Sequence, residues 1–182
     1  MIKKSLIIVF CYLMLGIIFS CENWCSHVKY YDFNEAEINL NKNNLNKSDS
    51  LFFRIEPIDL YFLADNIQKT QLFETAYAFK CDNGYGGMKY EVIKIEITSD
   101  SDFNDQFLTN TLLNDLVTVK KGNISNKFDH IKLNDVDLSE IIWSELYIVD
   151  HPTISKEHIF SIKLFKSDGV VISIQSEKII WQ

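Results

Sequence analysis

The chain has 182 residues, of which 25 are acidic and 18 are lysine or arginine, so its formal net charge is −7 at pH 7. This acidic balance predicts repulsion from nucleic acid and from anionic lipid headgroups, and we expect no nucleic-acid partner. The length fits one folded domain with its own core. Aromatic residues make up 13% of the chain, enough to fill such a core without a ligand.

The N-terminus has the pattern of an export signal. Lys3 and Lys4 precede an apolar run at residues 6–19, which is too short to span a bilayer stably. We predict a signal peptide at 1–20, a tether arm at 21–34 and a folded domain at 35–182. Removing the signal takes two lysines and no acid, so the charge of the mature chain falls to −9.

The end of this signal predicts a lipid anchor. The sequence Ile18-Phe19-Ser20-Cys21 resembles the lipobox of bacterial lipoproteins, although Phe19 stands where a small or polar residue is usual. We therefore expect cleavage before Cys21 and lipidation of its thiol. This assignment predicts a cell-envelope protein held at the outer membrane through its lipid, on either the periplasmic or the surface side.

Two cysteines remain after signal removal and lipidation. Cys11 leaves with the signal, so Cys25 and Cys81 are the thiols left in a compartment where disulfides persist. A bridge between them would close a loop of more than 50 residues and contribute roughly 4 kcal/mol in the chain-entropy model. We expect this bridge; two separately reduced thiols are the alternative.

The first half of the predicted domain contains four strand-like stretches. Residues 35–40 alternate apolar and polar side chains, and a longer run covers 51–63, in which Pro57 predicts a bulge, bend or break. Two further strands are predicted at 73–79 and 90–98. In the last one Ile93, Ile95 and Ile97 are expected to share one face of the sheet. Gly84-Tyr85-Gly86-Gly87 is expected to be a loop between strands.

The second half continues the same pattern. We predict a connection at 99–114 that includes a short helical turn, and strands at residues 116–119, 146–149, 158–165 and 170–174. A second helical turn is predicted at 139–143, capped by Ser139. Asp168-Gly169 predicts a tight hairpin of type I′. Short strands separated by turn residues indicate an all-β, immunoglobulin-like antiparallel β-sandwich with one or two short helical turns.

Several short motifs form an ordered series that spans most of the mature chain. They are the lipobox, Cys25, Cys81 with residues 84–87, residues 97–105, 113–116 and 156–160, and the Asp168-Gly169 hairpin. Together they resemble an uncharacterised lipoprotein family of Bacteroidetes, a domain family of unknown function. Lys80 and Asp82 beside Cys81 depart from the family pattern, in which a second cysteine or proline is more usual. The resemblance implies a small sandwich anchored to the outer membrane and implies no activity.

The acidic stretch Asp100–Asp105 is the best metal candidate in the sequence. Asp100, Asp102 and Asn104 alternate as in the opening of a calcium loop, but Asp105 and Thr111 replace the glycine and glutamate of an EF-hand. We favour local turn-capping by these side chains and predict no cofactor and no metal. The same carboxylates could serve as a glycosidase pair, but the four histidines are scattered, and no catalytic motif accompanies them.

Function is therefore expected from the surface and the anchor. We predict a lipid-anchored envelope protein with a binding or structural role and no catalysis, with a glycan or an envelope protein as its partner. A carbohydrate-active or calcium-dependent surface binding module is the alternative. Asp49-Ser50-Leu51 resembles the O-glycosylation site of Bacteroidetes envelope proteins. A binding patch could use exposed aromatic residues, with these as candidates: Trp24, Tyr30, Tyr31, Tyr61, Tyr85, Trp143 and Trp181.

Overall fold

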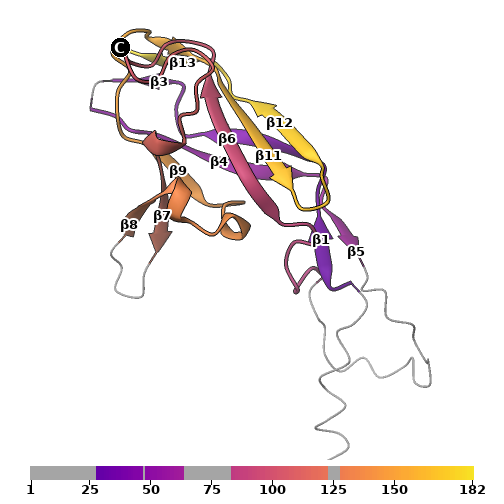
Figure 1. The fold of residues 1–182 in the computed structure, drawn as a ribbon. Helices are drawn as coiled ribbons and strands as arrows, with labels where there is room; N and C mark the ends of the chain where they lie inside the picture. Colours follow the sequence, from indigo (N-terminus) through magenta and orange to yellow (C-terminus); the bar gives the residue numbers. More distant parts are fainter. Residues whose placement is uncertain (1–27, 47, 64–82, 123–127) are drawn as a thin grey trace, which may run out of the picture. The chain divides into compact units, whose positions relative to one another are not determined.

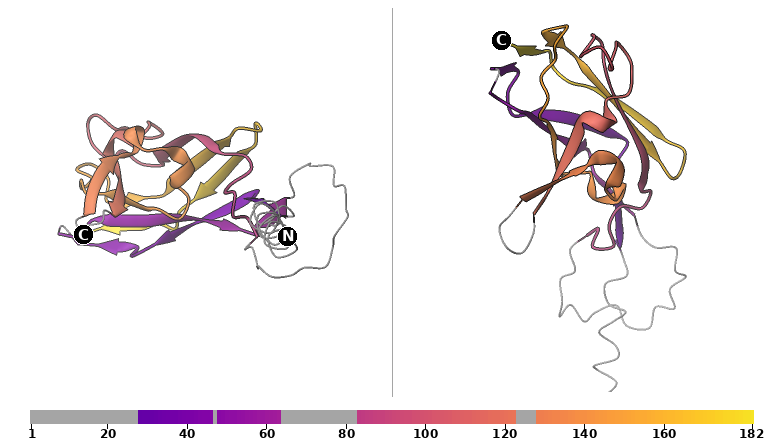
Figure 2. Two further views of the ribbon diagram at one scale, coloured as in Figure 1. Left: turned by 90° about the horizontal axis from the view of Figure 1, so that it is seen from below. Right: turned by 60° about the vertical axis from the view of Figure 1, so that its left-hand side comes forward.

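The computed structural model describes residues 28–46, 48–63, 83–122 and 128–182, drawn in colour in Figures 1 and 2. The chain divides into two compact units. Unit 1 comprises Met1–Asp32 and Tyr61–Lys89, and unit 2 comprises Phe33–Leu60 and Tyr90–Gln182. The predicted strand at 73–79 lies outside the described residues.

Unit 2 is the all-β antiparallel sandwich that the sequence predicts. Its larger sheet has the strand order β2-β4-β9-β7-β8, and its smaller sheet has the order β12-β11-β6, with all pairs antiparallel. The larger sheet is built from β2 (Glu35–Leu40), β4 (Leu51–Ile58), β7 (Val117–Gly122), β8 (Phe128–Lys132) and β9 (Glu145–Ile148). The smaller sheet is built from β6 (Val92–Ser99), β11 (Phe160–Lys166) and β12 (Val171–Gln175).

The remaining elements of unit 2 are short. A third sheet, β10-β13-β3, contains β3 (Asn44–Leu45), β10 (Glu157–His158) and β13 (Ile179–Trp181), and its β13–β3 pair is parallel. Three 3-10 turns, η2 (Asn114–Leu116), η3 (Leu133–Asp135) and η4 (Leu138–Glu140), provide the helical content of the described residues. The turn η4 begins one residue before the predicted 139–143 turn and ends at Glu140, so Ser139 lies within it and is not its N-cap. The turn η2 begins at Asn114, the last residue of the 99–114 connection.

The core of unit 2 follows the alternation of its strands. Buried side chains lie at every second position of β4, β9, β11 and β12, so each strand contributes one face. The fully buried members include Phe53, Ile55, Ile97, Leu146 and Ile162. Their opposite faces carry polar and aromatic residues, which determines where a functional surface can lie.

Two details of the predicted strands are wrong. Pro57 does not break β4, since it is still paired with Ala36 of β2. The chain turns two residues later, at Asp59, which has a φ of 53°. The carbonyl of Ile55 accepts a hydrogen bond from Trp143 on the side away from β2. Ile55 and Pro57 are two positions apart, so their backbone polar groups point to the same side of the strand, away from β2. On that side the pairing with β9 ends at Arg54, so no neighbouring strand needs an N–H from Pro57.

Ile93 does not share a face with Ile95 and Ile97. The register between β11 and β6 shifts at this point, with Phe165 opposite Lys94 and Lys166 opposite Val92. This β-bulge inserts Ile93 as an extra residue, so Val92 takes the buried position and Ile93 is 62% exposed.

The predicted strand at 158–165 and its hairpin also differ in detail. The strand is split at Ile159 into β10 and β11. The hairpin to β12 uses a three-residue loop in which only Gly169 has a positive φ, of 89°. A type I′ turn needs a positive φ at both central residues, so this loop matches a type I turn followed by a glycine bulge.

Unit 1 contains a two-stranded ribbon. Strand β1 (Tyr30–Asp32) pairs antiparallel with β5 (Tyr61–Leu63), so residues 30–32 of the expected tether arm form a strand. The loop at residues 84–87 lies against β1 and the two residues before it. Gly84 and Gly86 donate hydrogen bonds to the carbonyls of Val28 and Lys29. A Cβ at position 86 would lie 2.6 Å from the Lys29 side chain and 2.9 Å from its carbonyl oxygen. The loop needs glycine there for this close approach.

Candidate functional site: the outer face of the five-stranded sheet

The outer face of the larger sheet carries two rows of side chains that the pairing register brings into line. In the first row Asn39 is opposite Arg54, Arg54 is opposite Glu145, and Lys120 is opposite His130. In the second row Phe52 and Thr118 flank Tyr147, and Lys132 is opposite Thr118. We call these two rows the sheet-face ladder.

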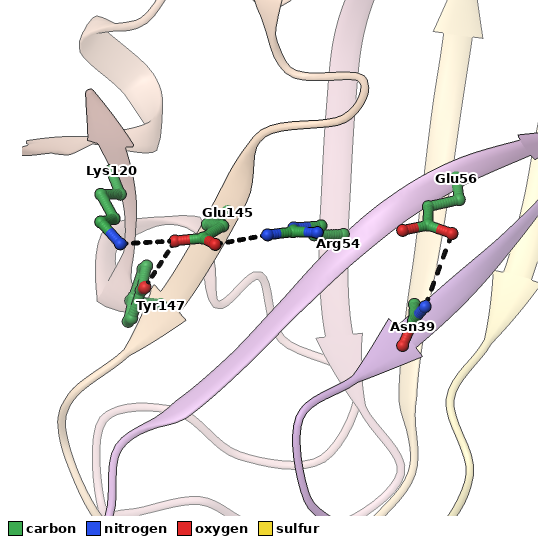
Figure 3. Close-up of polar contacts among 6 residues, drawn as sticks. All are labelled: Asn39, Arg54, Glu56, Lys120, Glu145 and Tyr147. Carbon is green, nitrogen blue, oxygen red and sulfur yellow. Dashed lines mark hydrogen bonds and ion pairs between the residues drawn. The ribbon is translucent and has the colours of Figure 1, made fainter. Parts of the chain in front are cut away.

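Glu145 connects three strands of this ladder. Its carboxylate accepts hydrogen bonds from Lys120 Nζ and from the Tyr147 hydroxyl, both at 2.8 Å, and also from the Arg54 guanidinium (Figure 3). These donors hold the pKa of Glu145 down at about 2, with the hydrogen bond from Lys120 the largest cause. Glu145 is therefore ionised at neutral pH.

The pKa values of the groups that bind Glu145 are raised. Its hydrogen bonds raise the pKa of the Lys120 ammonium and of the Arg54 guanidinium, so both cations stay protonated. Burial raises the pKa of the Tyr147 phenol, and the Glu145 carboxylate adds to this shift. Every resolved shift in the ladder moves a group away from neutral pH, which suits binding and orientation better than proton transfer.

Aromatic rings occupy the second row. The rings of Phe52 and Tyr147 stack with centroids 5.5 Å apart, and His130 meets Tyr147 edge-on at 4.8 Å. The Lys120 ammonium lies 6.0 Å from the centre of the Tyr147 ring. Because these side chains come from paired strands, their spacing is fixed by the backbone ladder rather than by a loop.

A buried serine and histidine form a hydrogen-bonded pair of the kind found in some catalytic sites. Ser99 Oγ lies 2.8 Å from His158 Nδ1, and His158 Nε2 lies 3.0 Å from the carbonyl oxygen of Ser155. The Ser155 carbonyl oxygen can only accept a hydrogen bond, so the proton of the neutral ring is on Nε2. His158 Nδ1 therefore accepts the hydrogen bond from the Ser99 hydroxyl. Ser99 is 1% exposed and His158 is fully buried. Neither side chain meets solvent, and we interpret the pair as part of the core.

The loop Asp100–Asp105 uses its oxygens within the protein. Asp102 accepts hydrogen bonds from the backbone and hydroxyl of Thr109, both at 2.6 Å, and these bonds lower its pKa. Asp100 accepts the Ile159 amide, and Asn104 accepts the amides of two later residues. Turn-capping of this kind is what the sequence favoured. Among the described residues no group of three or more His, Cys, Asp or Glu side chains could hold a metal ion.

The candidate aromatic residues are divided between the two units. Within unit 2, Trp181 is buried and Trp143 is 48% exposed. Four tyrosines, Tyr30, Tyr31, Tyr61 and Tyr85, belong to unit 1. Ser50 is exposed beside β4, and its glycosylation stays a prediction.

Four other predicted sites lie outside the described residues: Trp24, the lipidation site Cys21, and the disulfide partners Cys25 and Cys81. Their assignments stay predictions. None of the helical segments in the described ranges has the length and apolar character needed to cross a membrane. No protein-family model matches the chain, and no curated protein matches it significantly.

Sequence reasoning missed the sheet-face ladder. Its signal was present as polar or aromatic residues two positions apart, as in Thr118-x-Lys120 and Glu145-x-Tyr147. Alternation shows that such residues share a face, but only the strand order β4-β9-β7 shows that they meet.

Proposed function

We propose that this protein is a lipid-anchored component of the cell envelope that binds a partner and carries out no catalysis. Residues 1–21 support the anchor through their charge, apolar length and lipobox-like end. The sheet-face ladder supports the binding role, because it is an open face of ordered charged and aromatic groups. None of its resolved pKa shifts brings a group toward neutrality.

The observation that carries this proposal is the ordered set of charged and aromatic side chains across one open sheet face. Arg54 and Lys120 both bind Glu145, while Glu56 lies beside Arg54 on the same face of β4 and is opposite Glu37. Lys132 extends the second row and is exposed. The lysines of this face therefore lie on β7 and β8, and Glu37 and Glu56 lie on β2 and β4. A polar partner that carries groups of both signs would be complementary to it.

A binding screen tests this role. The mature chain, residues 21–182 with Cys21→Ser, would be passed over arrays of glycans and tested against envelope protein extracts fractionated by charge. Binding by the ladder predicts that Lys132→Gln and Tyr147→Ala weaken a detected interaction. Lys163→Gln on β11 is the matched control, since Lys163 is an exposed lysine of the other sheet. Equal losses in the ladder and control variants would contradict the assignment.

A carbohydrate-active or calcium-dependent surface module is the second candidate. It is favoured by the adjacency of Phe52, Tyr147 and His130 to the cations, since rings and charged groups together suit sugar ligands. Repeating the glycan screen with calcium and with a chelator separates the two forms of this alternative. Hydrolysis of a bound glycan would contradict the non-catalytic proposal.

The anchor and the disulfide have their own tests. Cells expressing the full chain would be labelled with a fatty-acid analogue, and we expect incorporation that Cys21→Ala abolishes. Equal incorporation by both proteins would contradict the assignment. Alkylation under denaturing, non-reducing conditions should modify neither Cys25 nor Cys81; modification of both would contradict the bridge.

A further inference from the structure

The outer face of the larger sheet has an acidic corner and a basic corner. Glu37 of β2 is directly opposite Glu56 of β4, in the row that follows Arg54 along β4. Lys132 of β8 is opposite Thr118 of β7, in the row that precedes Arg54 along β4. Since β2 and β8 are the two outermost strands of this sheet, Glu37 and Lys132 lie diagonally across the face from each other, and both are exposed.

The acidic corner places two carboxylates against each other. Like charges directly opposite each other on paired strands destabilise a sheet. Arg54, the cation next to Glu56 on β4, is bound to Glu145 (Figure 3). Asn39 donates a hydrogen bond to Glu56 at 3.5 Å, but an amide carries no charge to offset the repulsion from Glu37. A cation placed over this corner from another molecule would relieve that repulsion.

The lysines of the face lie at the other corner. Lys120 on β7 binds Glu145, and Lys132 on β8 is exposed. Figure 3 shows Lys120 and Glu56 on opposite sides of the contact between Arg54 and Glu145. Residues 47 and 123–127 are the part of unit 2 outside the described ranges, and both of their ionisable side chains are lysines. They therefore add no acid to this corner.

Aromatic rings lie between the two corners. Phe52 and Tyr147 are partly buried, and their stacked rings have centroids 5.5 Å apart. Each ring therefore still has apolar surface that a second layer could remove from water. An aromatic centre with charged groups around it is the composition expected of a protein–protein interface.

We propose that this face is a homodimer interface, on which the same sheet of a second copy packs face to face. This inference rests on the binding role proposed for the sheet-face ladder and names the partner. A two-fold axis can lie between the two sheets and cross the line from Glu37 to Lys132 at right angles at its midpoint. Such an axis places the acidic corner of each copy over the lysine corner of the other, and the contact is made twice.

A second copy fits this face better than a partner of one charge. A basic partner would be repelled by Lys120 and Lys132, and an acidic partner would be repelled by Glu37 and Glu56. A surface that carries both corners in the reverse order is attracted at both. The same face of a second copy is such a surface once it is turned by the two-fold rotation.

Sedimentation equilibrium of charge-reversed chains tests the proposal. The mature chain, residues 21–182 with Cys21→Ser, would be measured at low salt from about 10 μM to about 1 mM, and we expect a monomer–dimer equilibrium. Glu37→Lys and Lys132→Glu should each weaken dimerisation about tenfold. Each substitution puts like charges together at two symmetry-related contacts, so its effect is counted twice.

Mixing the two variants gives the most specific result. In a mixed dimer the reversed corner of one chain faces the reversed corner of the other, and the two unchanged corners also face each other. Both contacts are then attractive. An equimolar mixture of Glu37→Lys and Lys132→Glu should therefore dimerise about as strongly as the wild type, although neither variant does so alone. Local disturbance of the fold by either substitution would not be repaired by mixing.

Two further charge reversals are matched controls. Lys163→Glu alters an exposed lysine of β11, in the smaller sheet, and Glu177→Lys alters an exposed acid between β12 and β13. Both lie outside the proposed interface, so neither should change dimerisation. Circular dichroism checks that each variant is folded.

The outcomes separate this inference from the proposed binding role. A chain that stays monomeric at about 1 mM, a mixture that fails to recover dimerisation, or equal weakening by the interface and control variants would each overturn the homodimer. Recovery in the mixture would support it. A monomeric chain whose ladder variants still lose binding in the screen would overturn the second copy as the partner and keep the binding role. Equal losses in that screen would overturn the binding role, whatever the sedimentation shows.

Discussion

Two polar networks in unit 2 are each built around one ionisable residue, and their surroundings give them opposite properties. The histidine cluster joins His158 and Ser99 to three packed rings, those of Phe103, Phe160 and Trp181. The sheet-face ladder surrounds Glu145, whose side chain is 21% exposed. Burial keeps His158 neutral, whereas three donors keep Glu145 charged. A hydrogen bond in the buried histidine cluster and one in the sheet-face ladder therefore contribute differently to stability, because the groups of the cluster lose more contact with water on folding.

The largest expected effect comes from removing a ring of the histidine cluster. Trp181 is 5% exposed and lies edge-on to His158, with the ring centroids 5.4 Å apart. Trp181→Ala should destabilise the fold by about 3–5 kcal/mol, measured by urea unfolding, because it leaves a large cavity. Trp143→Ala is the control: Trp143 is 48% exposed, and we expect a loss below about 1 kcal/mol. Similar losses in the two variants would contradict the distinction between core and surface.

The next effect tests the ionisation of His158. His158→Leu leaves the Ser99 hydroxyl and the Ser155 carbonyl without their partner, a loss of about 2–3 kcal/mol. Burial lowers the pKa of His158 below its ordinary 6.5. The unfolded chain then binds more protons than the folded one, so stability should fall as pH drops from 6.5 toward the folded pKa. The variant should lack this step in a plot of unfolding free energy against pH. A step that survives in the variant would assign it to another group.

Glu145 should titrate in a more acidic window. Its pKa is lowered from 4.5 to about 2, so its contribution is complete above pH 4.5 and is lost as the pH falls toward 2. Glu145→Gln should destabilise the protein by about 1–2 kcal/mol at pH 7, since solvent screens the pairs. The variant should also respond less to acid below pH 4.5. If Glu145→Gln removed the step that begins below pH 6.5 instead, the two networks would be coupled.

The smallest effect is expected in the exposed loop. Asp102→Ala removes the two hydrogen bonds from Thr109 and should lower the melting temperature less than any of the three changes above. Calcium at 1 mM should leave the melting temperature of the wild type almost unchanged. A site of ~10 μM affinity would stabilise by roughly 2.7 kcal/mol under those conditions. A calcium-dependent rise that Asp102→Ala abolishes would make the calcium-binding alternative the leading one.

Local alternation predicted much of the fold. The stretch 35–40 is strand β2 to the residue, and the runs at 146–149 and 170–174 each differ from β9 and β12 by one residue at each end. The bulge at Ile93 was not predictable, since it depends on the register with β11 rather than on local pattern. Strand β8 was missed because 128–132 mixes charged and apolar residues without clear alternation. The ladder around Glu145 required the strand order, which no single segment encodes.

The amide of Asn114 has a consequence for how copies of this protein behave together. It accepts the Ile97 N–H and donates to the Ile95 carbonyl, and the Leu113 amide binds the Ile97 carbonyl, along the side of β6 that faces away from β11. A side chain thus stands where a neighbouring molecule's strand would otherwise pair. Unprotected sheet edges are templates for aggregation. For a protein that we propose to be concentrated in two dimensions by its anchor, Asn114 blocks edge-to-edge pairing through β6.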